Sequence, residues 1–182
     1  MAIRTELVDA SSLLVLRREV LRPGRPLEAA RFGGDELPGA FHVAAYEADP
    51  GAVSRGPQPT GPTESAGSTP AVLACGTFVP EDFPAGLIPP LTLAGRAPER
   101  AAGRAYRIRG MASAPAVRGR GYGTAVLRAG TAEAEARGVE LLWCNGRTVA
   151  RGFYERHGYT AVGGEFHIED VGSHHVFARA LG

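Results

Sequence analysis

Three glycines and two arginines alternate in one short segment of the chain, directly before a run, 124–137, that favours a helix. Glycine lets the backbone turn tightly and present several N–H groups, and at a helix start these groups and the helix dipole attract an anion. Arginine adds forked donors for phosphate oxygens. The segment is therefore a candidate site for a phosphate or pyrophosphate, and a purely structural turn is the alternative. It reads Arg118, Gly119, Arg120, Gly121, Tyr122, Gly123 and Thr124.

The glycine spacing separates this segment from two common phosphate-binding motifs. Gly-x-Gly-x-Gly brings the third glycine one residue too early for the dinucleotide-binding fingerprint, and the segment lies past the middle of the chain. A P-loop needs a lysine, whereas all 20 basic residues here are arginine. The absence of lysine also excludes a Schiff-base enzyme.

A second motif, at 150–159, makes the first one more specific. Together they resemble the Gcn5-related N-acetyltransferases, whose Arg-x-x-Gly-x-Gly loop is followed by an Ala-x-x-Phe-Tyr-x-x-x-Gly-aromatic segment. The resemblance is sharp over residues 105–162 and only topological before them. The matching residues are Pro115, Arg118, Gly121, Gly123, Ala150, Phe153, Tyr154, Gly158 and Tyr159.

The resemblance implies an α/β fold with a mixed, mostly antiparallel sheet that is splayed at its middle and flanked by helices. Acetyl-CoA, as co-substrate, would lie between the strands that end near Ser113 and Cys144. The glycine loop would hold its pyrophosphate. Main-chain groups near Met111, Ala112 and Ser113 would pair with the pantetheine arm, and one N–H would polarise the thioester carbonyl.

Two side chains after the glycine loop carry further implications. Tyr154 matches the family's general acid for the leaving thiolate, and a core aromatic is the alternative reading. Asn145 could bond coenzyme amides, but the family's usual asparagine lies seven residues before the tyrosine, where this chain has Arg147. Arg147 could touch the coenzyme or be a solvated surface residue.

The chemistry is consistent without the family name. A neutral amine attacks a thioester carbonyl, an oxyanion forms, and a phenol with a pKa of about 10 can protonate the departing thiolate. Main-chain donors aimed at the oxyanion lower the barrier, and no covalent enzyme intermediate is required.

Other reactive side chains are weaker candidates. Cys75 and Cys144 lie in apolar runs and are expected to be buried free thiols, so Cys144 is not expected to be a nucleophile. The five histidines lack metal-site spacing, and no metal is predicted. Possible bases or substrate contacts are His42, His174, Glu81 and Asp82.

Two groups of arginines could also bind an anion. Arg107 and Arg109 would share one strand face and could add donors for phosphate. On the first helix, a solvent-facing position is expected, and an acceptor site for an acidic substrate is the alternative. That helix carries Arg17 and Arg18, with Arg22 and Arg25 beyond it.

The elements that position these residues follow from apolar periodicity and turn signals. Strands are predicted at 3–8, 41–47, 71–78, 105–111 and 140–144, with closing strands at 159–162, 165–169 and 175–181. Helices are predicted after Ser11-Ser12, at 124–137, and from Thr148 to His157, with Ser11-Ser12 and Thr148 as N-caps. Segments 49–70 and 84–103 are rich in proline and glycine and are expected to be irregular.

Length and composition limit the classes of protein to which the chain can belong. The 182 residues suit one domain, 1–182, with a flexible insertion at 49–70. A net charge of +1 argues against nucleic-acid or membrane binding, and the lack of a signal-like start suggests a cytoplasmic protein.

The sequence therefore predicts an acetyl-CoA-dependent N-acetyltransferase that acts by direct attack. Its acceptor would be a small-molecule or peptide amine, and the enzyme could form a homodimer. A non-catalytic CoA-binding or regulatory module of the same fold is the alternative function.

Overall fold

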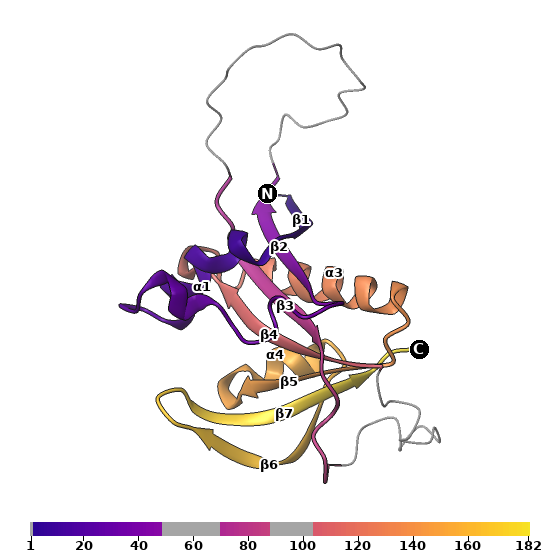
Figure 1. Cartoon of the computed structure of the whole chain (residues 1–182). Coiled ribbons are helices and arrows are strands. Elements are labelled where there is room, and N and C mark those ends of the chain that lie inside the picture. The colour runs from indigo at the N-terminus through magenta and orange to yellow at the C-terminus, as the bar shows by residue number, and fades with distance from the viewer. Residues whose placement is uncertain (1, 49–69, 88–103) are drawn as a thin grey trace, which may run out of the picture.

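The strands form one mixed sheet in the order β1-β2-β3-β4-β5-β7-β6, and neighbours are antiparallel except the parallel pair β4 and β5 (Figure 1). The computed structural model describes residues 2–48, 70–87 and 104–182. All but the last residue of the insertion expected at 49–70, and most of the irregular segment 84–103, lie outside these residues. The strands are β1 Ile3–Val8, β2 Phe41–Glu47, β3 Ala74–Pro80, β4 Ala105–Ser113, β5 Leu141–Arg147, β6 Thr160–Ile168 and β7 Gly172–Ala180.

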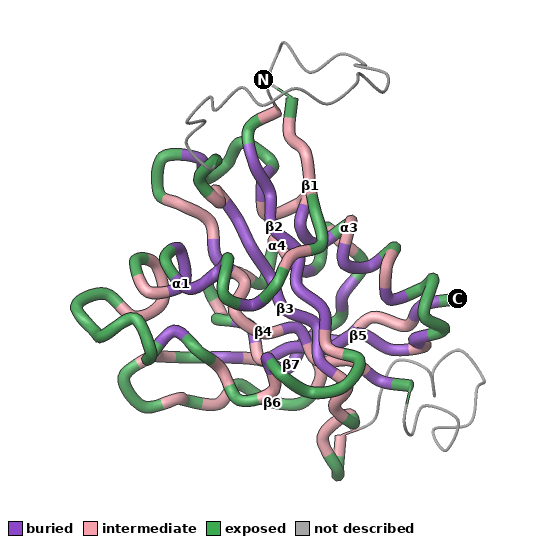
Figure 2. Tube along the Cα trace, turned by 45° about the horizontal axis from the view of Figure 1, so that its top comes forward, coloured by how far each residue is buried: buried purple, intermediate pink, exposed green. Residues whose placement is uncertain are grey.

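Helices cover both faces of this sheet. Leu13 and Leu16 pack with Ala44 and Cys75 on the face of α1, whereas Phe41 and Val43 face α3 and α4. The alternation of side chains along β2 explains how one strand serves both cores. Figure 2 shows buried residues concentrated along the central strands. The α-helices are α1 Leu14–Leu21, α3 Tyr122–Ala136 and α4 Arg151–Arg156, and 3-10 turns span Ala10–Leu13, Leu27–Ala30, Pro115–Val117 and Thr148–Ala150.

The sheet opens between β4 and β5. The two strands pair only from Ala105 with Leu141 to Arg107 with Trp143, so β4 from Ile108 onward has no β5 partner. Antiparallel β7 continues along all of β5, which keeps that half of the sheet intact. The predicted splayed, mixed α/β sheet is therefore confirmed.

A bulge interrupts β4 inside the splayed part. Cys75 pairs with Ala112 and Thr77 with Arg109, so Gly110 and Met111 together face one residue of β3. Gly110 has φ +60°, and a Cβ there would lie 2.8 Å from Phe32 Cε2. The bulge changes the alternation of β4, because Ile108 and Met111 both reach the core beneath α3.

Most predicted elements are found, with corrections at their ends. The helix α3 begins at Tyr122 rather than Thr124, with Gly121 as its N-cap at φ +89°. β6 runs through a bulge between Val162 and Phe166, so the segments predicted at 159–162 and 165–169 are one strand. The strand predicted at 71–78 begins and ends later, as β3.

Both predicted serine and threonine N-caps are wrong. The first turn follows Asp9 and α1 follows Leu13, and neither start is capped by a side chain within the described ranges. Thr148 instead donates its hydroxyl to Glu165 Oε2 at 2.8 Å and so links the turn before α4 to β6. Tertiary contact has here replaced a local capping bond.

No helix within 2–48, 70–87 and 104–182 is both long and apolar enough to cross a membrane. The same residues contain no group of three or more histidine, cysteine, aspartate or glutamate side chains able to hold a metal ion.

Candidate active site

The splay between β4 and β5 forms a cavity of about 400 Å³, called here the splay cavity. Its walls come from both splayed strands, the end of α1, the segment before β2, the start of α4 and the hairpin of β6 and β7. The described lining residues are Leu21, Arg22, Phe32, Arg107, Ile108, Arg109, Gly110, Met111, Asn145, Gly146, Arg147, Val149, Ala150, Tyr154, Ile168, Val171 and His174.

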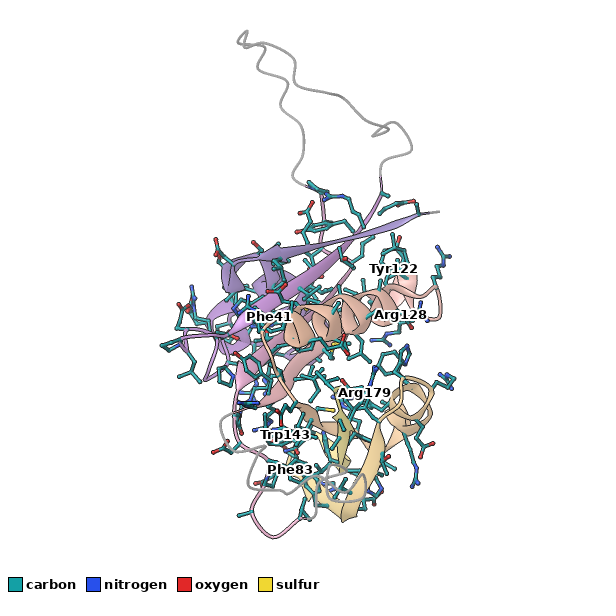
Figure 3. The ribbon with its side chains drawn as sticks, turned by 90° about the vertical axis from the view of Figure 1, so that its right-hand side faces the viewer. Phe41, Phe83, Tyr122, Arg128, Trp143 and Arg179 are labelled. Carbon is teal, nitrogen blue, oxygen red and sulfur yellow. The ribbon has the colours of Figure 1, made fainter. Side chains whose placement is uncertain are left out.

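A second hollow of about 300 Å³, the loop hollow, lies where α3 begins. Figure 3 shows Tyr122 at that end of α3, in the half of the molecule that contains β1 to β4. Trp143 and Phe83 lie in the other half, and their rings make an edge contact at 6.0 Å. The described residues that line the loop hollow are Ser113, Val117, Arg118, Gly119, Gly121, Tyr122, Gly123, Thr124, Phe153 and Arg156.

The glycine loop exposes main-chain donors to the loop hollow. Gly119 and Gly121 have φ of +74° and +89°, which side-chain-bearing residues rarely adopt. The N–H groups of Arg118 and Arg120 donate within the preceding turn, and that of Ala125 donates to Gly121. The first N–H groups of an α-helix have no partner inside the helix, and no side chain of the described residues caps α3. These donors, with the helix dipole, suit an anion.

The two hollows follow one another along β4. Met111 lines the splay cavity and Ser113, two residues later, lines the loop hollow. On the opposite wall, Tyr154 borders the first hollow and Phe153 the second. An elongated ligand bound along the unpaired edge of β4 would therefore reach from the glycine loop to the middle of the sheet.

Comparison with known proteins agrees with this geometry. Residues 39–159 match the Acetyltransferase (GNAT) family. The chain belongs to this family. It is therefore an N-acyltransferase enzyme that draws on acyl-CoA donors, and the alternative of a non-catalytic module is set aside. The resemblance noted in the sequence is confirmed.

Individual relatives of this GNAT enzyme span nearly its whole length. It is 24% identical over 166 residues to the uncharacterized N-acetyltransferase YitI of Bacillus subtilis (strain 168), covering 91% of this chain and 88% of that protein. An acyl-CoA N-acyltransferase from Pseudomonas aeruginosa aligns with a TM-score of 0.60 and 18% identity, covering 98% of this chain and 100% of the other. A GCN5-related N-acetyltransferase from Kribbella flavida gives 0.62 and 20%, covering 99% and 98%.

In this GNAT enzyme, Tyr154 belongs to the core and also borders the splay cavity. The residue is 6% exposed, and its ring stacks on Phe177 with the centroids 4.8 Å apart, beside the Cys144 thiol. Burial, and then the neighbouring Cys144, raises the pKa of Tyr154 well above its usual range. The phenol is therefore protonated at neutral pH, as a general acid must be.

The remaining predicted coenzyme residues divide into three groups. Met111 and the half-buried Asn145 line the splay cavity. Tyr122 borders the loop hollow but is buried within the core. Ala112 packs in the α1 core, and Arg120 is exposed and borders neither of the two hollows among the described residues, so side-chain roles at these two positions gain no support.

The cysteines are free and buried, as predicted. Burial raises the pKa of Cys75 to about 11 and that of Cys144 to about 12. Both thiols are therefore protonated at neutral pH and are poor nucleophiles.

Of the four candidate bases, His174 alone lines the splay cavity. His174 lines the splay cavity at 4% exposure, and its Nδ1 lies 2.7 Å from the Gly172 carbonyl oxygen. A carbonyl only accepts, so Nδ1 carries the proton and Nε2 keeps its lone pair in the neutral ring. His42 instead bonds Thr77 Oγ1 at 2.8 Å, away from this cavity. Glu81 pairs with two arginines, and Asp82 does not line the splay cavity.

The arginine predictions need correction. Arg107 and Arg109 do share a face, but both pair with Glu81, at 2.7 and 3.3 Å, and they border the splay cavity rather than the loop hollow. Arg17 is neither solvent-facing nor a lining residue. It is fully buried, 2.8 Å from Asp35.

Two features of the structure were not predicted from the sequence. Phe32 and Gly110 meet at the floor of the splay cavity, where the bulge of β4 passes. A glycine inside an apolar strand is a signal for a bulge, so Gly110 could have been found. Arg17 lies one helical turn after Leu13, a spacing that places it on the buried face.

Proposed function

We propose that this enzyme transfers the acetyl group of acetyl-CoA to a primary amine by direct attack on the thioester. The succession of the loop hollow and the splay cavity along one strand edge supports the proposal most strongly. The pyrophosphate would bind the N–H groups at the start of α3. The pantetheine arm would pair with the main chain of β4 at 111–113, where β5 leaves the edge unpaired.

Charge develops on the thioester oxygen during the attack. The amine nitrogen forms a bond to the carbonyl carbon, and the carbonyl electrons move to oxygen. A main-chain N–H at the bulge of β4, near Gly110 and Met111, would donate to this oxyanion. A donor already in place needs no reorganisation, and one such bond is worth about 10²-fold in rate.

Two side chains would move the protons. The amine loses its proton to Nε2 of His174, and the carbon–sulfur bond then breaks. Tyr154 donates its phenolic proton to the departing thiolate, which leaves as CoA. Solvent returns a proton to Tyr154 and removes one from His174, so the enzyme is regenerated.

Thermal unfolding with and without ligands tests the donor. A ligand that binds only the folded protein raises the melting temperature. Acetyl-CoA and CoA should raise it, whereas NADH should not. Amine-dependent thiol release then tests turnover, because free CoA must appear only when acceptor is present. A melting temperature unmoved by either CoA form would overturn the proposal.

A further inference from the structure

The splay cavity is strongly basic at the end away from the glycine loop. Four arginines line it, together with His174, and no carboxylate side chain does so among the described residues. The net charge of the whole chain is only +1, so the positive charge of the cavity could not be inferred from the composition. The arginines are Arg22, Arg107, Arg109 and Arg147.

The nearby acidic groups do not balance these arginines. In the described part of the chain, Arg107 and Arg109 share one carboxylate, Glu81, and Arg109 also donates to the Gly33 carbonyl at 2.8 Å. Among the described residues, the Arg22 side chain donates to one main-chain carbonyl, that of Leu21, at 3.2 Å. Within the described residues, neither Arg22 nor Arg147 has a carboxylate within ion-pair distance.

Arg109 carries the clearest sign of this imbalance. Burial, and then the positive charge of Arg107, lowers the pKa of Arg109. Its Nε atom is buried and has no hydrogen-bond partner in the described part of the chain. An anion placed beside Arg109 would reduce the repulsion and satisfy this donor.

The coenzyme phosphates would not reach these arginines. Arg109 precedes the bulge of β4, whereas the loop hollow begins at Ser113, beyond it. The basic end instead lies beside the end of α1 and the hairpin of β6 and β7, where apolar side chains complete the wall. These are Leu21, Phe32, Ile168 and Val171.

We propose that the acceptor is an amine that also carries an acidic oxyanion group, held by Arg22 and Arg109, with an apolar body against Phe32 and Leu21. This assignment rests on the proposed function. An arginine fork binds a carboxylate or a phosphate through two parallel hydrogen bonds, which fixes orientation as well as position. The amine would then point along the cavity toward His174 and the thioester.

Matched acceptors test the assignment at saturating acetyl-CoA. Leucine is compared with leucinamide, and phosphoethanolamine with ethanolamine, by kcat/KM for thiol release. Leucinamide has a less basic amine than leucine, so a larger fraction of it is unprotonated at neutral pH. This difference favours leucinamide and therefore works against the proposal in the first comparison. We expect the acidic member of at least one pair to be favoured roughly tenfold or more, as a charged hydrogen bond predicts. The pair that shows the preference distinguishes carboxylate from phosphate.

Variants connect the preference to the arginines. Arg22→Gln and Arg109→Gln should each reduce the acid-to-neutral ratio by about tenfold, chiefly through the acceptor KM, and leave the KM for acetyl-CoA unchanged. Among the described residues the Arg22 side chain donates one hydrogen bond, to the Leu21 carbonyl, so its variant should fold even if Arg109→Gln does not. Arg18→Gln, at a partly exposed site on α1 that lines neither hollow, is the control.

The two proposals fail in different ways. Neutral amines acetylated as fast as their acidic partners, or a ratio unchanged in both variants, would overturn the acceptor assignment alone. Absence of any acetyl-CoA effect on the melting temperature would overturn the proposed function as well.

Discussion

Arg17 Nη1 lies 2.8 Å from Asp35 Oδ2, and both side chains are buried beneath the bulge of β4. Arg17 also donates to Thr77 Oγ1 on β3, and its guanidinium lies 4.8 Å from the ring of Phe32. With Thr77, the pair thus connects three parts of the chain: α1, the segment that precedes β2, and strand β3. Because Phe32 also meets Gly110, this buried pair supports the floor of the splay cavity.

The first prediction concerns that pair. Asp35→Asn leaves the Arg17 charge buried without its partner, so the free energy of unfolding should fall by about 3 to 5 kcal/mol. Urea unfolding measures the change. Glu28→Gln breaks the exposed pair with Arg31 and should cost under about 1 kcal/mol. Equal costs for the two variants would contradict the prediction.

The second prediction concerns pH. Burial is the main cause that lowers the pKa of His42 below 6.5 in the folded chain. The unfolded chain therefore binds more protons than the folded chain just below pH 6.5, so stability is present above that pH and is lost as the pH falls through this window. Wild type should lose more unfolding free energy than His42→Gln between about pH 7 and pH 5. Parallel pH curves for the two proteins would rule out a role for His42.

The third prediction concerns the glycine loop. Gly121→Ala forces an alanine to φ +89°, and moving the loop misplaces its N–H donors, so CoA affinity should fall about tenfold. Gly138→Ala imposes similar strain at φ +74°, with no atom near the new methyl group, at the far end of α3. Calorimetry should show normal CoA binding for Gly138→Ala. Equal losses of affinity would mean that the loop acts only through stability.

The fourth prediction concerns the proton donor. Tyr154→Phe should lower kcat about 10²-fold and leave acetyl-CoA affinity unchanged, because only the step that expels the thiolate needs the phenol. Tyr159→Phe is the control, since Tyr159 contacts the Tyr154 ring at 5.7 Å but lines neither the splay cavity nor the loop hollow. Comparable turnover in both variants would remove Tyr154 from the mechanism.

The fifth prediction concerns the base. His174→Gln should slow acetylation of strongly basic amines about 10²-fold, since their nitrogen holds its proton tightly after the attack and needs a base to lose it. Weakly basic acceptors, such as hydrazines, form a more acidic nitrogen in the adduct, which can lose its proton to water, and should be affected much less. A structural role for His174 would slow both classes equally. The ratio of kcat/KM between the two classes is therefore the measurement that decides.

Much of the fold was predictable because its signals are local. Apolar runs located the strands, and the face formed by Val126, Leu127, Gly130 and Ala134 located α3, since periodicity depends only on the helix repeat. The prediction that Thr148 caps a helix failed because a distant residue, Glu165, accepts the hydrogen bond of its hydroxyl. The loop and the motif at 150–159 identified the family for the same reason: each is a contiguous run of residues.

The sequence by itself determined which residues could carry the chemistry, because glycines, a phenol and arginines are recognisable from type and spacing. Only the tertiary structure decided which of them meet. It placed Arg107 and Arg109 against Glu81 rather than at the loop hollow, buried Arg17 against Asp35, and brought His174 to the cavity. These contacts join residues far apart along the chain, and no local propensity specifies them; they depend on the register of the strands and on where β4 parts from β5.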